Sequence, residues 1–180
     1  MIKLKITREA YLKLRYFTEL CETEISGLGK VRQISQETLE IYDIEILEQR
    51  VSMAHSNLDE DALAKFLYQK VSNNKNVSDY KVWWHSHVDM EAFFSPIDDR
   101  TIESSTEFPY LISIVTNKRG HDQVRLDIFK PLRLTIPLEV ELSLEEDKEL
   151  KEKCQIEIEE KVKKRWTIST LKGKKRYSIL

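Results

Sequence analysis

Residues 83–98 read WWHSHVDMEAFFSPID, and this run limits the possible folds more than any other part of the chain. An exposed loop seldom carries two adjacent tryptophans, and a plain core strand seldom carries two histidines. The aromatic and branched side chains of residues 79–88 predict a buried strand. Ser95 and Pro96 then favour a helix over residues 95–105, because serine caps helices and proline fits their first position.

The two histidines of this strand are placed to act together. Side chains alternate between the faces of a strand, so His85 and His87 share one face while Trp84 lies on the other. Zinc prefers nitrogen and oxygen ligands in a tetrahedron, and a catalytic zinc usually has three protein ligands and a water molecule. Asp98 is the candidate third ligand, because the first turn of the predicted helix can direct its carboxylate back toward the strand end.

Each half of this pattern also has an ordinary explanation. Ser-Pro-Ile-Asp is a capping box, in which Ser95 and Asp98 satisfy free backbone N–H groups. One of the two strand histidines can equally be a hydrogen-bonded core residue. The chain has only four histidines, so His-x-His followed by seven residues and Ser-x-x-Asp is expected by chance in fewer than roughly one such chain in a thousand. The combination therefore favours a metal site.

The rest of the chain alternates between strand patterns and helix patterns. Thr7 is the expected cap of the first helix, and residues 50–58 fit neither pattern. Strands are expected over residues 2–6, 24–35, 38–49, 110–117 and 123–130, and helices over residues 8–23 and 59–71. The fold class is therefore α/β (α+β), with a mixed, curved sheet flanked by helices.

The character of the sequence changes after Pro131 and Pro137. Residues 139–160 carry ten acidic side chains in a helical pattern, and residues 161–180 carry eight Lys or Arg and no acid. We therefore predict a compact domain over residues 1–138 and a charged C-terminal extension over residues 139–180, which could dock a partner protein or cover a cleft.

Composition narrows the class of protein. A net charge of −2 gives no overall attraction to nucleic acid or membrane, and no apolar run approaches the roughly 18 residues of a membrane span. Cys21 and Cys154 lie far apart without metal-ligand spacing and are expected to be reduced, packed thiols. The N-terminus lacks the apolar region of a signal peptide, so we expect a cytoplasmic protein.

The pattern His85-x-His87-x7-Ser95-x-x-Asp98 resembles the signature of the JAMM metalloproteases, also called the MPN-plus or JAB domain. That family also has a glutamate after its first helix, in a Glu-x-x-Gly setting, and Glu24-Ile25-Ser26-Gly27 stands in the matching place. The resemblance covers about residues 3–130. The compact layout of the chain is similar to that of the stand-alone prokaryotic members. One departure is Val88, where members of the family often carry proline.

The resemblance implies one zinc ion per chain, with His85, His87 and Asp98 as its ligands. It implies that Glu24 exchanges protons with the attacking water and the departing amine, and that Ser95 donates a hydrogen bond to the tetrahedral oxyanion. The implied activity is that of an isopeptidase or peptidase. Its expected substrate is the C-terminal tail of a ubiquitin-like protein or a sulfur-carrier-like protein.

Three alternatives stay open at this point. His85-x-His87-x-Asp89 also matches the start of a metallo-β-lactamase-like motif, but Met90 stands where that fold needs a further histidine. Some MPN domains have lost their zinc ligands and serve as protein-interaction scaffolds, although all five expected residues are present here. The basic residues 161–180 include aromatic side chains that could contact nucleic acid, but a solvated tail balanced by the preceding acidic helix explains them better.

Overall fold

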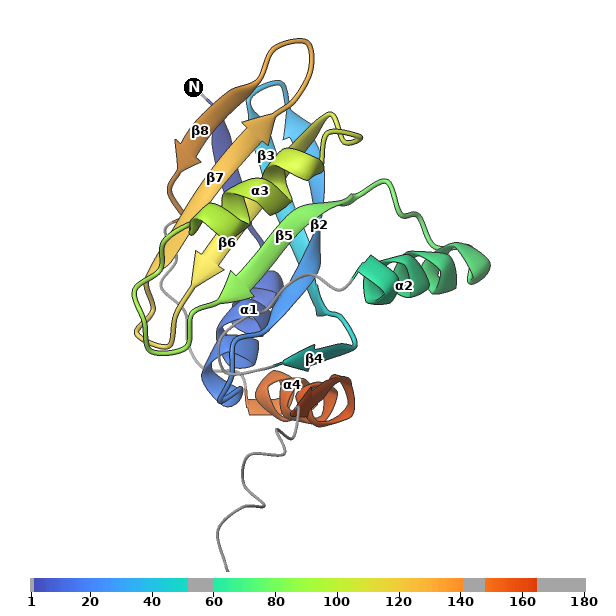
Figure 1. The fold of residues 1–180 in the computed structure, drawn as a ribbon, viewed down its shortest axis with the longest axis vertical. Helices are drawn as coiled ribbons and strands as arrows, with labels where there is room; N and C mark the ends of the chain where they lie inside the picture. The colour runs from blue at the N-terminus through green and yellow to red at the C-terminus, as the bar shows by residue number, and fades with distance from the viewer. Residues whose placement is uncertain (1, 52–59, 141–147, 165–180) are drawn as a thin grey trace, which may run out of the picture.

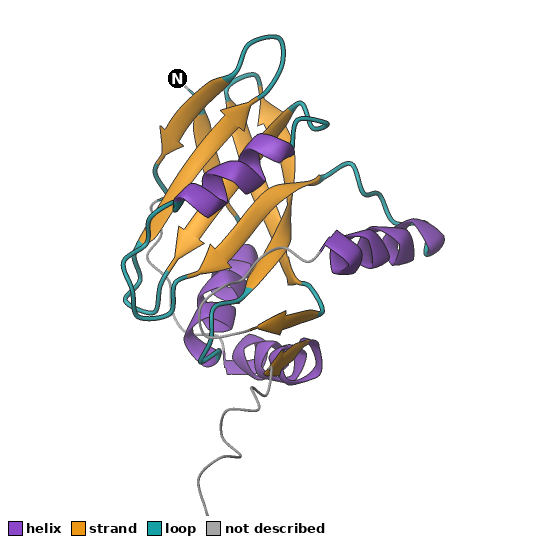
Figure 2. Ribbon diagram, in the orientation of Figure 1, coloured by secondary structure: helices purple, strands orange, loops and turns teal. Residues whose placement is uncertain are grey.

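The computed structural model describes residues 2–51, 60–140 and 148–164. Figure 1 shows the arrangement of its helices and strands, and Figure 2 shows the same view by type of element. In chain order the elements are β1 (Lys3–Ile6), α1 (Arg8–Leu20), β2 (Ser26–Ser35), β3 (Thr38–Ile46), β4 (Gln49–Val51), α2 (Glu60–Ser72), β5 (Tyr80–Ser86), α3 (Pro96–Ser104), β6 (Tyr110–Thr116), β7 (Asp122–Ile128), β8 (Leu134–Leu138), α4 (Lys148–Lys161) and β9 (Val162–Lys164).

The main sheet has seven strands in the order β1-β3-β2-β5-β6-β7-β8. The pairs β1–β3 and β5–β6 are parallel, and the other neighbouring pairs are antiparallel. The parallel step from β5 to β6 requires a crossover, and α3 lies within it. The predicted mixed sheet flanked by helices is thus confirmed (Figure 2).

Alternation along β5 separates the two layers of helices. Trp84 is fully buried and stacks on Phe17 of α1, with ring centroids 6.0 Å apart and an interplanar angle of 7°. Trp83 faces the other way and packs in a cluster with Ile102 of α3. In Figure 1, α3 accordingly crosses in front of the sheet. The histidine strand therefore lies between two packed layers, which fixes its position.

Gly27 of β2 allows the close approach of its neighbours. A Cβ atom at this position would lie 2.1 Å from the Glu45 carbonyl oxygen and 2.7 Å from Trp84 Nε1. The indole N–H of Trp84 also donates a hydrogen bond of 3.2 Å to the same carbonyl oxygen. Glycine has a low preference for strands, but at position 27 the close packing of β2 against its neighbours leaves no room for a side chain.

Several elements lie where the sequence analysis assigned none or placed different bounds. β8 is an edge strand that contains Pro137, and an edge strand tolerates proline because it need not donate to a further neighbour. The first helix ends at Leu20 rather than at residue 23, and Cys21 is its C-cap. β4 begins at Gln49, the last residue of the strand expected over residues 38–49, and runs into the region that fitted neither pattern. Residues 52–59 lie outside the described part.

The described part of the C-terminal extension packs on the rest of the chain. α4 confirms a helix within the acidic region, and its Cys154 and Ile158 side chains join the main core beside α1. β9 pairs in parallel with β4 in a separate two-stranded sheet. The boundary at residue 138 stays a prediction, and residues 141–147 and 165–180 lie outside the described residues.

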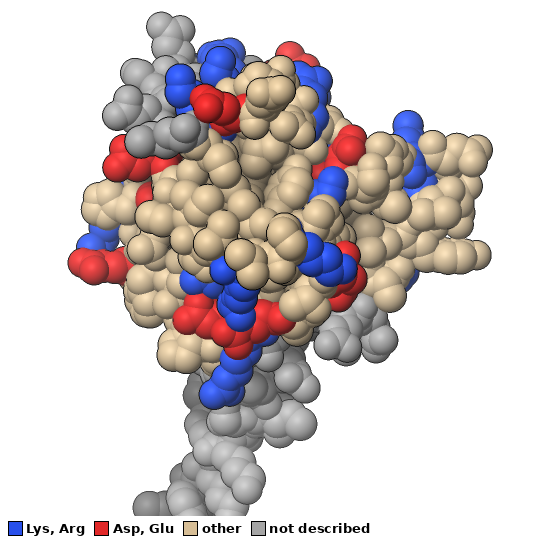
Figure 3. All heavy atoms as spheres, turned by 90° about the horizontal axis from the view of Figure 1, so that it is seen from above, with Lys and Arg blue, Asp and Glu red and all other residues tan. Residues whose placement is uncertain are grey.

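Charges on the described surface are mixed. Figure 3 shows basic side chains lying beside acidic ones over one face of the molecule, rather than one broad basic surface. Among the described helices, none combines the length and the apolar character that crossing a membrane requires.

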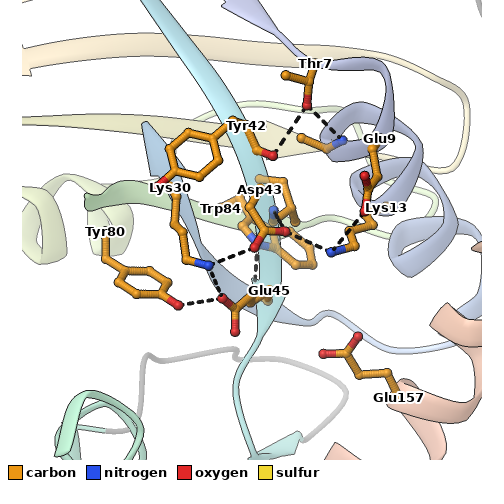
Figure 4. Close-up of polar contacts among 12 residues, drawn as sticks. Thr7, Glu9, Lys13, Lys30, Tyr42, Asp43, Glu45, Tyr80, Trp84 and Glu157 are labelled. Atoms are coloured by element: carbon orange, nitrogen blue, oxygen red, sulfur yellow. Dashed lines mark hydrogen bonds and ion pairs between the residues drawn. The ribbon is translucent and has the colours of Figure 1, made fainter. Parts of the chain in front are cut away.

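A network of ion pairs joins the β2–β3 hairpin to two helices. Figure 4 shows its centre around Lys30, Asp43 and Glu45 and its link to α1. Lys30 Nζ lies 2.9 Å from Asp43 Oδ2 and 3.0 Å from Glu45 Oε1, and Lys13 of α1 lies 2.8 Å from Asp43 Oδ1. Lys70 of α2 pairs with Glu45 from the other side. Burial alone raises the pKa of Glu45, but hydrogen bonds from Lys70, Tyr80 and Lys30 outweigh burial and lower that pKa. The same balance lowers the pKa of Asp43.

The free energy of unfolding is expected to fall as the pH drops below about 4.5, the reference pKa of the Glu45 carboxyl group. The folded pKa values of Asp43 and Glu45 lie below the reference values of 3.8 and 4.5, so their contribution is complete above those values and is lost as the pH falls through the folded pKa. Glu45→Gln should cost about 2 kcal/mol at neutral pH, between the values for exposed and buried ion pairs, and should flatten this pH dependence. Urea unfolding at several pH values measures both effects.

The exposed Glu107 provides the matched control for this experiment. Glu107→Gln should leave both the stability at neutral pH and its pH dependence unchanged. A Glu45→Gln protein whose stability still falls as steeply as that of the wild type would contradict the role given to the network.

Candidate metal centre

β5 and the residue that follows it carry the two histidines. His85 and His87 are 3% and 6% exposed. The His87 N–H donates a hydrogen bond of 2.8 Å to the carbonyl oxygen of Thr116 on β6, which extends the strand geometry one residue beyond β5. The imidazole of His85 stacks on Trp83, and the rings of His87 and Phe93 form a T-shaped pair, each with ring centroids 4.9 Å apart. Both rings are therefore held on one face of the sheet.

The first turn of α3 carries Asp98, and the predicted capping box is present. The Ser95 N–H donates to Asp98 Oδ2 at 2.7 Å, and the Asp98 N–H donates to Ser95 Oγ at 3.3 Å. The second carboxylate oxygen, Asp98 Oδ1, lies 3.4 Å from His85 Nε2. Asp98 can therefore serve in the capping box and as a candidate metal ligand at the same time, because each role uses a different oxygen of its carboxylate.

The three side chains converge closely enough to share one cation. His85 Nε2 and His87 Nε2 are 3.2 Å apart, and the ligand atoms of all three residues lie within 4.8 Å of one another. In a tetrahedral zinc site with bonds of roughly 2.0–2.1 Å, neighbouring ligand atoms are about 3.3 Å apart. The two measured separations around His85 Nε2, 3.2 and 3.4 Å, match that spacing.

The hydrogen bond of the His87 imidazole also suits a cation. His87 Nδ1 lies 2.7 Å from the Glu91 carbonyl oxygen. A carbonyl oxygen can only accept, so Nδ1 carries the proton and Nε2 presents a lone pair toward His85. Within the described part of the chain, His85 Nδ1 is buried without a hydrogen-bond partner. Two imidazole nitrogens and one carboxylate oxygen form the nitrogen-and-oxygen donor set that zinc prefers.

Asp98 supplies a negative charge to this donor set at neutral pH. Burial raises the pKa of Asp98, but the interactions with His85 and the hydrogen bonds with Ser95 outweigh burial and bring that pKa to about 2. A group with this pKa is ionised throughout the physiological range. The site thus combines two neutral ligands with one anionic ligand.

Glu24 is half-buried and lies two residues before β2, the strand that neighbours β5. The antiparallel register pairs Ser26 with His85, and the Ser86 N–H donates to the Ile25 carbonyl oxygen at 2.9 Å. Continued by one more residue, this register sets Glu24 opposite His87, on the same face of the sheet. Within the described residues the Glu24 carboxylate makes no hydrogen bond or ion pair that would occupy it.

The loop between His87 and α3 is held by polar side chains that the sequence analysis did not single out. Asn117, fully buried, donates from Nδ2 to the Met90 carbonyl oxygen at 2.8 Å. The Lys118 N–H donates to the Val88 carbonyl oxygen at 2.7 Å. Val88 has a φ of 49°, a conformation that β-branched residues rarely adopt. These contacts hold the strained backbone next to His87 and the path of the chain toward the helix.

A salt bridge fixes the start of α3 on the sheet. Arg125 of β7 pairs with Asp99 at 2.7 Å and with the buried Asp127 at 2.9 Å, and its guanidinium lies 4.4 Å from the centre of the Phe94 ring. No local sequence signal identifies the link from Arg125 to α3, because Asp99 belongs to a separate element. Asp99, which offered a second carboxylate in the sequence, is therefore engaged away from the histidines.

The structure separates the two metal motifs that the sequence allowed. Asp89 is exposed, and the only group of potential ligands found among the described residues is His85, His87 and Asp98. His121 is also exposed, in the turn between β6 and β7. The metallo-β-lactamase-like interpretation, which needs Asp89 beside the histidines, is therefore not favoured.

A mixed sheet with a His-x-His strand, followed by a helix that begins with Ser-x-x-Asp, defines an α/β protein with a candidate metal centre at a strand–helix junction. The family model for prokaryotic homologs of the JAB domain matches residues 23–127, more than half of the chain, and this range includes Glu24 and the three candidate ligands. The chain therefore belongs to this family.

A solved structure shows the same fold. The solution structure of protein DSY2949 from Desulfitobacterium hafniense is similar with a TM-score of 0.53 and 14% sequence identity, over 79% of this chain and 95% of that chain. At this identity the similarity concerns the fold alone. No curated protein matches the sequence.

Proposed function

We propose that this protein is a zinc-dependent peptidase or isopeptidase that cleaves after the C-terminal tail of a ubiquitin-like or sulfur-carrier-like protein. The observation that carries the proposal is the convergence of His85, His87 and Asp98 at distances that suit one zinc ion. The choice of substrate rests on the resemblance of the motif to JAMM metalloproteases. We place the activity in the cytoplasm, and we expect neither membrane nor nucleic acid as a partner.

The residues of the site can divide the reaction among them. When bound, zinc supplies Lewis-acid activation of a water molecule and a carbonyl group. Glu24 accepts a proton from the attacking water and delivers it to the departing amine. One C–O bond forms and the amide C–N bond breaks, so the products are a carboxylate-ended tail and a free amine.

Ser95 has a hydroxyl proton left for the substrate. Its Oγ accepts the hydrogen bond from the Asp98 N–H, so its own O–H is available to donate. A donor at this position can stabilise the oxyanion that develops on the scissile carbonyl. The capping interaction fixes the position of Oγ, which keeps the donor in place before the substrate arrives.

Ser95→Ala is expected to lower kcat by about 10²–10³-fold, the usual effect of losing one oxyanion donor. It should also destabilise the protein by about 1 kcal/mol, because alanine cannot cap α3. Ser95→Gly separates the two effects, since glycine at an N-cap costs only a few tenths of a kcal/mol. Steady-state kinetics and thermal unfolding of both variants provide the measurement. If Ser95→Gly cleaves at the wild-type rate, the hydroxyl has no catalytic role.

An extended tail could reach the site along a strand edge. Main-chain hydrogen bonds to such an edge bind a peptide largely independently of its sequence, and a narrow Gly-Gly ending would bring the scissile carbonyl toward the metal ligands. This mode of binding suits both substrate classes, because ubiquitin-like and sulfur-carrier-like proteins end in similar tails.

The decisive experiment combines metal analysis with cleavage assays. The purified protein is expected to contain about one zinc ion per chain and to cleave a ubiquitin-like domain or a sulfur-carrier domain from a fused reporter. A protein that neither contains zinc nor gains activity when zinc is added would instead be a protein-interaction scaffold.

A further inference from the structure

The segment that runs from Glu24 into β2 is held by contacts on its two edges, one facing β5 and the other facing away from β5. On the β5 side, the Ile25 carbonyl oxygen accepts from the Ser86 N–H at 2.9 Å, and the Ile25 N–H donates to Ser86 Oγ at 3.2 Å. On the other side, β3 pairs with β2 only as far as the Gly27–Ile46 pair. The backbone of the next residue, Ser26, therefore needs a different partner.

The side chain of Gln49 is that partner. Its Oε1 accepts from the Ser26 N–H at 3.0 Å, and its Nε2 donates to the Ser26 carbonyl oxygen at 2.8 Å. The amide thus takes the place that a backbone amide of β3 would occupy if the strand continued. Gln49 is 8% exposed, so water cannot easily replace these bonds.

Gln49 is in turn held by contacts from two directions. Its Nε2 also donates to the Leu47 carbonyl oxygen at 3.0 Å. β4, which begins at Gln49, is paired with β9 in the register Gln49–Val162. At the end of α4, Lys161 Nζ donates to the Ile46 carbonyl oxygen at 3.3 Å. A continuous set of contacts thus leads from the C-terminal extension to the residue next but one to Glu24.

We propose that Gln49 is a positioning residue, which fixes the start of β2 so that the Glu24 carboxylate faces the metal ligands, and that β9 holds Gln49 in place. The inference rests on the proposed function of Glu24 as proton carrier. It assigns a role to the C-terminal extension, because β9 then supports the site from outside the motif positions. A displacement of about 1 Å in a reacting group can cost on the order of 10² in rate.

Gln49→Ala is expected to lower kcat by at least about tenfold while KM and the zinc content stay at wild-type values. Zinc should be retained because Gln49 bonds to β2, whereas the ligands belong to β5 and α3. Gln49→Glu keeps an acceptor for the Ser26 N–H but loses the donor to the Ser26 carbonyl oxygen, so it should recover only part of the rate. Gln33→Ala, at an exposed glutamine of β2, is the matched control.

Amide hydrogen exchange provides a second readout that does not depend on activity. In Gln49→Ala, the amides of residues 24–27 should exchange at least about tenfold faster than in the wild type, with little change in β6 and β7. Lys163→Pro, which disrupts the pairing of β9 with β4, should give the same local increase. The two variants combined should lose little more activity than either alone, since both act through Gln49.

The outcomes separate this inference from the proposed function. If the wild type has no peptidase activity, the proposed function fails, and hydrogen exchange still tests whether Gln49 fixes residues 24–27. Unchanged exchange at these residues in Gln49→Ala overturns the inference. So does an active wild type whose Gln49→Ala variant has the same kcat, or one that loses activity only together with its zinc.

Discussion

Glu24→Gln is expected to reduce cleavage by at least about 10³-fold without changing the zinc content. Glutamine has nearly the shape of glutamate but cannot accept a proton from water, and general acid–base groups usually contribute about 10²–10⁴-fold to the rate. Glu24 is expected to act twice, on the water and on the amine, so its loss affects both steps. The measurement is single-turnover cleavage of a ubiquitin-like fusion, together with metal analysis of the same preparation.

Glu22 provides the control for this prediction. It is an exposed glutamate two residues away, so Glu22→Gln changes the charge of the region by the same amount. The variant should cleave at the wild-type rate. If Glu22→Gln is the inactive protein and Glu24→Gln is not, the register argument that places Glu24 opposite His87 is wrong.

Asp98→Ala is expected to remove the zinc ion and, with it, the activity. Residues that only support metal ligands typically cost about 10–100-fold in affinity when mutated, so loss of a ligand should exceed about 100-fold. The remaining two imidazoles have no anionic partner, which weakens the site further. A competition titration with a zinc-binding dye measures the affinity of each variant.

Asp89→Ala is the matched comparison, since Asp89 also follows the histidine pair but is exposed. This variant should bind zinc as the wild type does. Zinc lost from Asp89→Ala and kept by Asp98→Ala would support the metallo-β-lactamase-like motif instead. Because Asp98 also takes part in the capping box of α3, the thermal unfolding of Asp98→Ala should be measured alongside the titration. Asp98→Asn removes the negative charge but keeps an acceptor for the Ser95 N–H, so it separates loss of the ligand from loss of the cap.

Local patterns predict the histidine strand, its helix and the capping box well, because each depends on near neighbours in the sequence. His85 and His87 must share a face on any strand, and the box that Ser95 forms with Asp98 is a contact within one turn. The assignment of Asp98 as a ligand needed one further step, the placement of that turn at the strand end. The structure supplies this placement through the parallel crossover from β5 to β6.

Other features depend on contacts between distant parts of the chain, and the sequence did not predict them. Gln49 bonds to Ser26 only because β3 ends early and the chain turns back toward β2. Arg125 holds the start of α3 from a strand that follows it in the sequence. The strand around Pro137 lies outside the expected strands, because proline argues against a central strand, whereas this strand lies at the edge of the sheet. In each case tertiary pairing decides the structure.

The two carboxylate oxygens of Asp98 have separate partners, and this has a consequence for how a metal ion would bind. Oδ2 is committed to the helix cap, so the carboxylate keeps its orientation whether or not a metal has arrived. A metal ion would then bind with little rearrangement of the polypeptide, so the fold would form first and the ion would bind afterwards. This order differs from that of small zinc domains, in which the ion itself organises the fold.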